Sequence, residues 1–367
     1  MNKFAVYVHI PFCEQKCLYC DFASFVCPEN VKKEYACALI DEINSSNKKG
    51  KVSSIYFGGG TPSVLDEKDI GRILETLRNK FDVLKDAEIT IECNPNSTTY
   101  EKLLYYKKIG INRISFGVQS LQNNILKKIG RLHNDEQAIN AILMAQKAGF
   151  DNISADLMIG LMGQTKEKLV GDAEKLVALG INHISTYILQ VEKGTPLFDM
   201  VENKEIVLPN DNQTIKLYEA LVKGLKKLEF KQYEISNFAK DKMFSKHNMA
   251  YWKRSNYLGF GLAAHSFWGR KRWANSKDMK KYLAHKGKQS EMLSKEEIIT
   301  EIIMLGLRCD IGVNTKKLLK LGYDITQNSY YKNYIENKIL LQKGSKLLLN
   351  KKYYGVSNTI ICNLLLK

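Results

Sequence analysis

The chain has 367 residues, of which 44% are hydrophobic and 26% are charged, and this composition is typical of a globular protein. It excludes disorder, collagen and a coiled coil, and no apolar run reaches the ~18 residues that a membrane-spanning helix needs. The net charge of +16 would suit an anionic partner, but the lysines are scattered and no nucleic-acid-binding signature accompanies them. The first residues enter a strand pattern at once, so we expect a cytoplasmic protein without a signal peptide that does not bind nucleic acid.

Short β-branched or aromatic runs alternate with amphipathic segments through the first part of the chain. Strands are expected to begin near residues 4, 53, 88, 112, 152 and 182, and helices are expected over 67–80, 100–109, 136–148 and 167–179. Such alternation predicts a parallel sheet with right-handed crossover connections. We therefore expect an α/β fold, a partial, TIM-like (βα)6 barrel over residues 1–230.

The pattern changes after about residue 208, where a helix over 211–228 leads into an aromatic-rich extension over 231–290. Residues 291–367 are expected to form a small α+β domain, with helices over 296–307 and 315–321 and a hairpin made by 347–349 and 353–356. Helices followed by a hairpin predict a winged-helix-like shape. Such domains often bind DNA, but a fold alone does not assign a function.

Polar or conformationally special residues follow all six predicted strands. Because the active sites of parallel barrels lie at the carboxyl ends of the strands, these residues predict a single functional site at that end of the barrel, its mouth. In chain order they are the Cys13–Cys20 loop, Gly58–Thr61, Glu92 with Asn94, Gln119, Asp156 and Gln190.

Three of the eight cysteines, Cys13, Cys17 and Cys20, have the spacing Cys-x3-Cys-x2-Cys in the loop after the first strand. Three thiolates on a tight loop can hold three irons of a 4Fe–4S cube and leave the fourth iron open. Zinc, with His9 as a fourth ligand, is the alternative for this loop. The glycines and carboxylates expected at the same mouth favour the cluster. The other five cysteines read as small buried hydrophobes.

The run from Tyr7 to Cys13, with Cys17, Tyr19 and Cys20, resembles the signature of the radical S-adenosylmethionine superfamily. More narrowly, the chain is similar to the oxygen-independent coproporphyrinogen III oxidase-like family, which includes coproporphyrinogen III dehydrogenases and HemW-type haem chaperones. The resemblance implies that S-adenosylmethionine chelates the open iron. One electron would then split its sulfonium C–S bond into methionine and a 5′-deoxyadenosyl radical.

The resemblance also implies which residues hold these cofactors. The metal ligands would be Cys13, Cys17 and Cys20, and the S-adenosylmethionine contacts would be Tyr7, Gly59, Gly60, Thr61, Glu92, Gln119, Arg131 and Asp156. The glycines match a motif whose backbone meets the methionine amino group. Taken singly, Asp156 would read as a strand-end cap and Arg131 as a solvated charge, but their alignment around one rim favours a pocket.

Two features distinguish the branches of this family. Coproporphyrinogen dehydrogenases carry one more cysteine two residues after the third ligand, where this chain has Phe22. The run from His247 to Trp252 matches the HNxxYW motif of the haem-binding HemW-type branch. His247, Tyr251 and Trp252 are therefore the implied haem residues, with His247 as the axial ligand. The alternatives are that His247 caps a turn beside two packed aromatic rings, and that His265 belongs to the cofactor pocket.

The resemblance implies a haem chaperone that binds haem, a 4Fe–4S cluster and S-adenosylmethionine. It would deliver haem to haem-dependent respiratory enzymes, take electrons from a flavodoxin or ferredoxin, and associate peripherally with an acidic membrane. No catalytic residue is assigned, and the use of radical chemistry is left open. Three alternatives remain: oxidative decarboxylation of coproporphyrinogen III, a radical methyltransferase or haem-cleaving relative acting on haem, and a zinc-stabilised DNA-binding protein.

Overall fold

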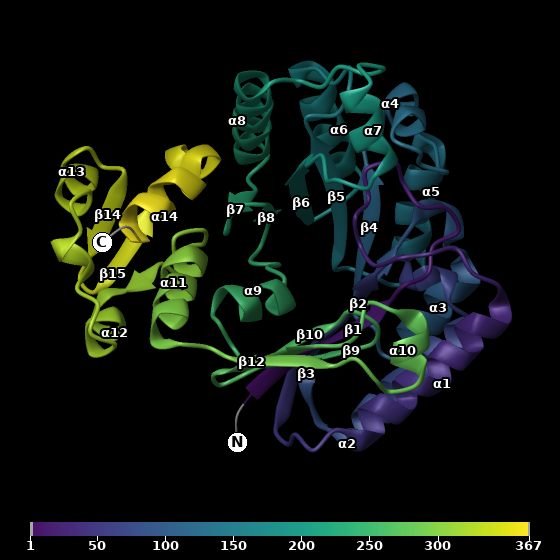
Figure 1. Ribbon diagram of the computed structural model, residues 1–367. Coiled ribbons are helices and arrows are strands. Elements are labelled where there is room, and N and C mark those ends of the chain that lie inside the picture. The colour runs from purple at the N-terminus through teal and green to yellow at the C-terminus, as the bar shows by residue number, and fades with distance from the viewer. Residues whose placement is uncertain (1–2, 366–367) are drawn as a thin grey trace.

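A computed structural model describes residues 3–365 of the chain (Figure 1). Its centre is a twelve-stranded sheet with the order β12-β11-β10-β9-β1-β2-β3-β4-β5-β6-β8-β7. The strands β1 to β6 pair in parallel and in chain order. The sheet is open, because β12 and β7 form its two edges. The expected α/β fold with a central parallel sheet is confirmed, and the open edges correspond to a partial barrel.

The large sheet and the helices around it are built from the following segments. The strands are β1 (Lys3–Ile10), β2 (Lys51–Gly59), β3 (Asp82–Cys93), β4 (Arg113–Gln119), β5 (Ile153–Ile159), β6 (His183–Ile188), β7 (Lys231–Gln232), β8 (Asn237–Ala239), β9 (Tyr257–Phe260), β10 (His265–Trp268), β11 (Lys271–Ala274) and β12 (Gln289–Met292). The helices are α1 (Glu29–Ser45), α2 (Glu67–Lys80), α3 (Tyr100–Lys108), α4 (Asn123–Lys128), α5 (Asp135–Lys147), α6 (Lys166–Ala178), α7 (Pro196–Glu202), α8 (Asp211–Lys227), α9 (Lys246–Trp252) and α10 (Met279–Leu283).

Local signals in the sequence explain where several of these helices begin. Thr99, Asn134 and Thr165 each precede a helix, and each side chain accepts a hydrogen bond from a backbone N–H of the first turn. These bonds satisfy donors that have no partner inside the helix. The crossover helices α3, α5 and α6 therefore begin immediately after the loops that carry the chain back from the sheet.

The parallel strands have an apolar face and a polar face. In β2, Ile55 and Phe57 are fully buried in the main hydrophobic core, whereas Ser54 and Tyr56 alternate with them. Since successive side chains of a strand point to opposite faces, the apolar face packs beneath the surrounding helices and the polar face lines the barrel interior. The barrel interior is therefore lined by hydrogen-bonding groups and can hold polar ligands.

Residues 231–292 contribute strands to both edges of this sheet. The strand β8 pairs antiparallel with β6 and is followed by β7 at one edge, while β9 pairs in parallel with β1 on the other side. The short helix α9 lies between these strands in the sequence and packs against the inner face of β2. The aromatic-rich extension expected over 231–290 is thus built into the large sheet.

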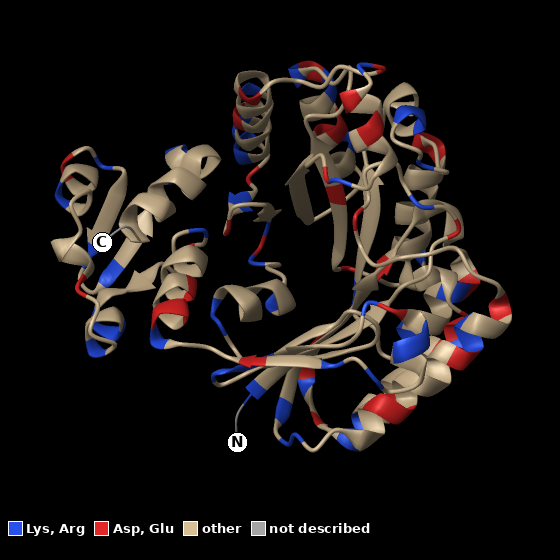
Figure 2. Ribbon diagram, in the orientation of Figure 1, with Lys and Arg blue, Asp and Glu red and all other residues tan. Residues whose placement is uncertain are grey.

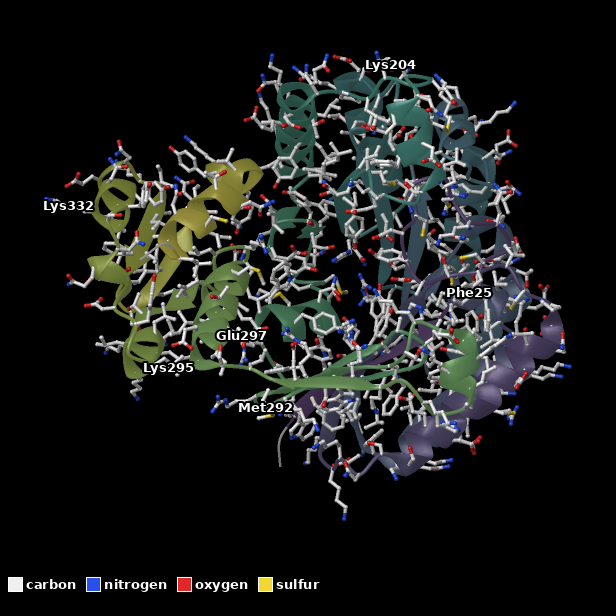
Figure 3. The ribbon with its side chains drawn as sticks, in the orientation of Figure 1. Phe25, Lys204, Met292, Lys295, Glu297 and Lys332 are labelled. Carbon is white, nitrogen blue, oxygen red and sulfur yellow. The ribbon has the colours of Figure 1, made fainter. Side chains whose placement is uncertain are left out.

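The last part of the chain forms a small unit beside the large sheet (Figure 1). It consists of α11 (Lys295–Gly306), β13 (Val313–Asn314), α12 (Thr315–Lys320), α13 (Tyr331–Glu336), β14 (Leu340–Lys343), β15 (Lys346–Leu349) and α14 (Ser357–Leu365). Figure 3 labels Met292, Lys295 and Glu297, which mark the crossing from the large sheet into this unit.

The C-terminal hairpin differs from its prediction. The partner of β15 is the preceding strand β14, whereas residues 353–356 belong to a 3₁₀ segment over Lys351–Val356. A tight turn at Gly344, whose φ is +58°, joins the two strands, and a glycine adopts this left-handed conformation readily. The sequence analysis overlooked this turn signal and placed the hairpin one strand too late.

Charged side chains of both signs are spread over the molecule (Figure 2). Lysines and arginines lie on many elements and are interspersed with aspartates and glutamates. Within residues 3–365, every helix is too short or too polar to span a membrane.

Candidate functional site

A cavity of about 400 Å³ lies where the parallel strands β1 to β6 end. It gathers all three predicted metal ligands and every predicted S-adenosylmethionine residue except Tyr7. These residues are Cys13, Cys17, Cys20, Gly59, Gly60, Thr61, Glu92, Gln119, Arg131 and Asp156. Asn94 and Gln190, which follow the third and sixth strands, also line it. Segments that are up to about half the chain apart in sequence thus share one chamber, which we call the mouth cavity.

The cysteine loop forms one wall of the mouth cavity. Thr61 donates a hydrogen bond from its hydroxyl to Cys13 Sγ at 3.6 Å, and Arg131 Nη1 lies 3.4 Å from Cys17 Sγ. Burial raises the pKa of the Cys13 and Cys20 thiols, so without a positive ligand both favour the protonated form. A bound metal centre would reverse this preference, because thiolates are its ligands.

The arrangement of the loop bears on the choice between an iron–sulfur cube and zinc. Across residues 3–365, no three His, Cys, Asp or Glu side chains converge as ligands of a single ion. Both ring nitrogens of His9 are engaged, Nδ1 with the Tyr7 hydroxyl at 3.0 Å and Nε2 with the Ala23 carbonyl at 2.9 Å. Zinc needs ligands that converge on one point, whereas a cube takes one thiolate at each iron. The donor set therefore fits a cube better than zinc.

The glycine triplet brings bare backbone to the cavity. Gly59 has a φ of +116°, and a Cβ at this position would lie 2.5 Å from the His9 ring. A Cβ on Gly60 would lie 2.7 Å from the carbonyl oxygen of Phe12. Only glycine fits both positions, and the exposed backbone leaves room for a ligand to approach closely.

Two half-buried carboxyl groups also line the mouth cavity. Glu92 accepts hydrogen bonds from the Tyr56 hydroxyl at 2.7 Å and from the Gly59 N–H at 3.2 Å, and Ser115 donates to Asp156 at 3.4 Å. Burial and, to a smaller extent, the negative charge of Asp156 raise the pKa of Glu92 to about 7. Burial also raises the pKa of Asp156. Such a pair favours a ligand that brings positive charge or hydroxyl donors.

Arg131 connects three walls of the mouth cavity. Besides its contact with Cys17, its Nη2 donates to Asn94 Oδ1 at 2.8 Å and to the Gly117 carbonyl at 2.5 Å. Its buried Nε has no hydrogen-bond partner among the described residues. The guanidinium would thus offset the negative charge of a metal-bound thiolate at Cys17, and it keeps one donor unused.

Comparison with known proteins decides the family. Residues 7–176 match the Radical SAM superfamily. The chain is 38% identical to the heme chaperone HemW of Bacillus subtilis (strain 168), over 85% of each chain. It is 33% identical to the heme chaperone HemW of Lactococcus lactis subsp. lactis (strain IL1403), over 99% of this chain and 97% of the relative. The chain belongs to the HemW-type branch of the radical SAM superfamily.

The solved structure of coproporphyrinogen III oxidase (HemN) from Escherichia coli has the same fold as this HemW-type chain. The two superpose with a TM-score of 0.84 at 20% identity, over 99% of this chain and 90% of the other. Membership of the superfamily implies a 4Fe–4S cluster and S-adenosylmethionine. The thiols, bare glycine backbone and paired carboxyls of the mouth cavity fit these two groups.

The histidine of the HNxxYW motif lies inside the HemW-type barrel. His247 is buried, with Nδ1 3.1 Å from Ser54 Oγ and Nε2 2.9 Å from the Tyr251 hydroxyl. Its ring stacks on Tyr56 with the centroids 4.9 Å apart, and burial lowers its pKa to about 3. Both nitrogens are engaged in this conformation, so the expected binding of haem iron by His247 would require the release of Ser54 or Tyr251.

The other two predicted haem residues of the motif, Tyr251 and Trp252, lie in different surroundings. Trp252 donates a side-chain hydrogen bond to the buried carboxyl of Glu234, and it lines neither the mouth cavity nor the second cavity described below. Tyr251 lines that second cavity, together with Tyr7 and His265. The motif therefore anchors α9 to the barrel interior, and only its tyrosine reaches a cavity.

The sequence analysis overlooked Tyr56, whose hydroxyl binds Glu92. The alternation of side chains along a strand could have identified it. Tyr56 lies two residues before Gly58 and therefore on the same face of β2. Arg254 and Arg272, which line the second cavity, carried no such signal.

Proposed function

We propose that this HemW-type protein is a haem chaperone that binds haem, a 4Fe–4S cluster and S-adenosylmethionine and delivers haem to haem-dependent respiratory enzymes. The observation that carries the proposal is Phe22, which is 63% exposed and lines the mouth cavity. Coproporphyrinogen dehydrogenases have a thiol at the matching position, and a phenyl ring can neither ligate metal nor transfer hydrogen. Two relatives, which match 85% and 99% of this chain, carry the name heme chaperone.

The chain's own residues would divide the cofactor binding as follows. Cys13, Cys17 and Cys20 would hold the cluster, and the backbone at Gly59 and Gly60 would admit the methionine part of S-adenosylmethionine. When bound, the cluster supplies one electron for cleavage of the sulfonium C–S bond. The carboxyl of Glu92 would accept hydrogen bonds from the ribose hydroxyls, and Gln119 and Asp156 would complete the pocket.

The remaining parts of the proposal concern location and partners. A flavodoxin or ferredoxin would deliver the electron at the cysteine loop, where Glu14, Gln15 and Lys16 are exposed. The net charge of +16 suits peripheral association of a cytoplasmic protein with an acidic membrane, where respiratory acceptors lie. We assign the cofactors to the barrel of residues 1–230, and we assign no ligand to residues 291–367.

Anaerobic reconstitution followed by two assays on the same sample tests the proposal. We expect about four irons and equivalent sulfide per chain, saturable haem binding, and no protoporphyrinogen from added coproporphyrinogen III. Stoichiometric protoporphyrinogen formation would identify a dehydrogenase. Zinc without sulfide would exclude the radical chemistry, and loss of the haem spectrum on turnover would indicate a haem-modifying enzyme.

A further inference from the structure

A second cavity of about 460 Å³ lies between the inner face of β1, β9 and β10 and the helices α9 and α11. Its walls are mostly aromatic or aliphatic, and they include Tyr257, Phe267, Met304 and Leu305. This cavity shares no lining residue with the mouth cavity. Its volume and apolar walls are those of a site for an organic ligand.

Two guanidinium groups and one carboxylate line one end of this second cavity. Arg254 Nε lies 2.6 Å from one carboxylate oxygen of Glu301, and Arg272 Nη2 binds the other oxygen. Inside the cavity one carboxylate thus serves two guanidinium groups, and Glu291, which does not line the cavity, lies 3.7 Å from Arg272 Nη1. Arg254 also has a buried Nη2 with no hydrogen-bond partner among residues 3–365. Guanidinium groups pair well with carboxylates, so this end favours an apolar ligand that carries acidic groups.

The six histidines of the chain differ in whether a ring nitrogen is free. His9, His183 and His247 have both nitrogens hydrogen-bonded. Buried His133 donates from Nε2 to the Val118 carbonyl, and its buried Nδ1 has no partner among the described residues. Two histidines are exposed, and neither ring has a hydrogen bond within the described part of the chain. They are His265 and His285, of which His265 alone lines a cavity described here.

We propose that the second cavity is the haem site of this protein, with His265 as an axial ligand of the iron and Arg254 and Arg272 facing the propionates. This inference rests on the proposed haem-chaperone function and gives it a location. Tyr257 and Phe267 supply flat walls for the macrocycle.

The proposed haem site borders the mouth cavity through one side chain. The ring of His9 lines the second cavity, and it also occupies the space that a Cβ on Gly59 would need. Gly59 itself lines the mouth cavity. Haem in the second cavity would therefore lie across the His9 ring from the cofactor pocket, which places cargo and cofactor side by side.

Ferric haem titration of the reconstituted full chain tests this inference. We expect H265A to shift the Soret band and to weaken haem affinity on the order of tenfold or more, as for other lost contributions to a metal site. H285A is the matched control, since it removes an exposed histidine outside the cavity and should titrate like wild type. In H265G, added imidazole should restore the wild-type Soret band, whereas a merely structural role would give no such rescue.

The charged end is tested with R272Q. This variant should lower haem affinity with the Soret position unchanged, because it leaves the axial ligand in place. Haem binding by wild type with an unaltered H265A titration would overturn the haem site and leave the chaperone function standing. A wild-type protein that binds no haem would overturn the chaperone function itself. Competition between haem and S-adenosylmethionine for the second cavity would reassign it to a second molecule of the cofactor.

Discussion

Replacement of Glu92 by Gln should remove a pH-dependent term from the stability of the cofactor-free protein. Burial raises the pKa of Glu92 to about 7 from an ordinary value of 4.5. The unfolded chain therefore releases this proton near pH 4.5, while the folded protein keeps it to about pH 7. The stabilising contribution is complete below pH 4.5 and is lost as the pH rises to 7. At about 1.36 kcal/mol per pH unit, the loss amounts to at most about 3 kcal/mol.

The hydrogen bonds of Glu92 determine which contacts the Gln side chain of E92Q can still make. The Gln oxygen can still accept from the Tyr56 hydroxyl, but its NH₂ group would then face the Gly59 N–H, which donates to the carboxylate in the wild type. Two facing donors cost about 1 kcal/mol at every pH. Relative to wild type, E92Q should therefore be about 1 kcal/mol less stable at pH 4.5 and about 2 kcal/mol more stable at pH 8.

Urea denaturation of wild type, E92Q and E174Q at the two pH values measures these differences. Glu174 is an exposed residue of α6, so E174Q controls for the loss of a carboxylate at the surface. The reasoning fails if the stability difference between E92Q and wild type is the same at both pH values. It also fails if E174Q shows the same crossover.

Three further predictions concern the cysteine loop, the glycine triplet and α9. Alanine at all three loop cysteines should abolish the visible absorption of the reconstituted cluster, whereas C37A, at an exposed cysteine of α1, should retain it. G59A should destabilise the fold by about 2–3 kcal/mol, because the new methyl group meets the His9 ring at a positive φ; unchanged thermal stability would contradict this. Y251F should lower the free energy of unfolding in urea by about 1–3 kcal/mol, since it leaves the buried Nε2 of His247 without its partner; an unchanged free energy of unfolding would contradict this.

Local periodicity was sufficient to predict the six parallel strands and most of the crossover helices. The helix expected over 67–80 has these bounds in the structure, because Asp66 caps its first turn and its apolar residues recur at helical spacing. The residues after each strand could be assigned to one mouth by the same reasoning, since parallel strands end at one edge. The structure places the cysteine loop, Glu92 and Asp156 in one cavity there.

Long-range pairing and burial could not be read from the sequence. The strand β9 pairs with β1 across about 250 residues, and no local pattern records that partnership. The environment of His247 depends on which face of β2 receives α9, so the HNxxYW motif could not reveal that both ring nitrogens are occupied. The second cavity is formed by α11 meeting the sheet, which composition and periodicity do not describe.

The placement of β8 and β9 has a consequence for the synthesis of the chain. Both strands lie after the sixth β–α unit, yet they cover the flanks of β6 and β1. When residue 230 has just left the ribosome, β1 and β6 are therefore unpaired edge strands. Their free amides and carbonyls can pair with another chain, which promotes aggregation. Maturation of the barrel must wait until residues 231–292 emerge, and a fragment that ends at residue 230 should precipitate when it is expressed alone.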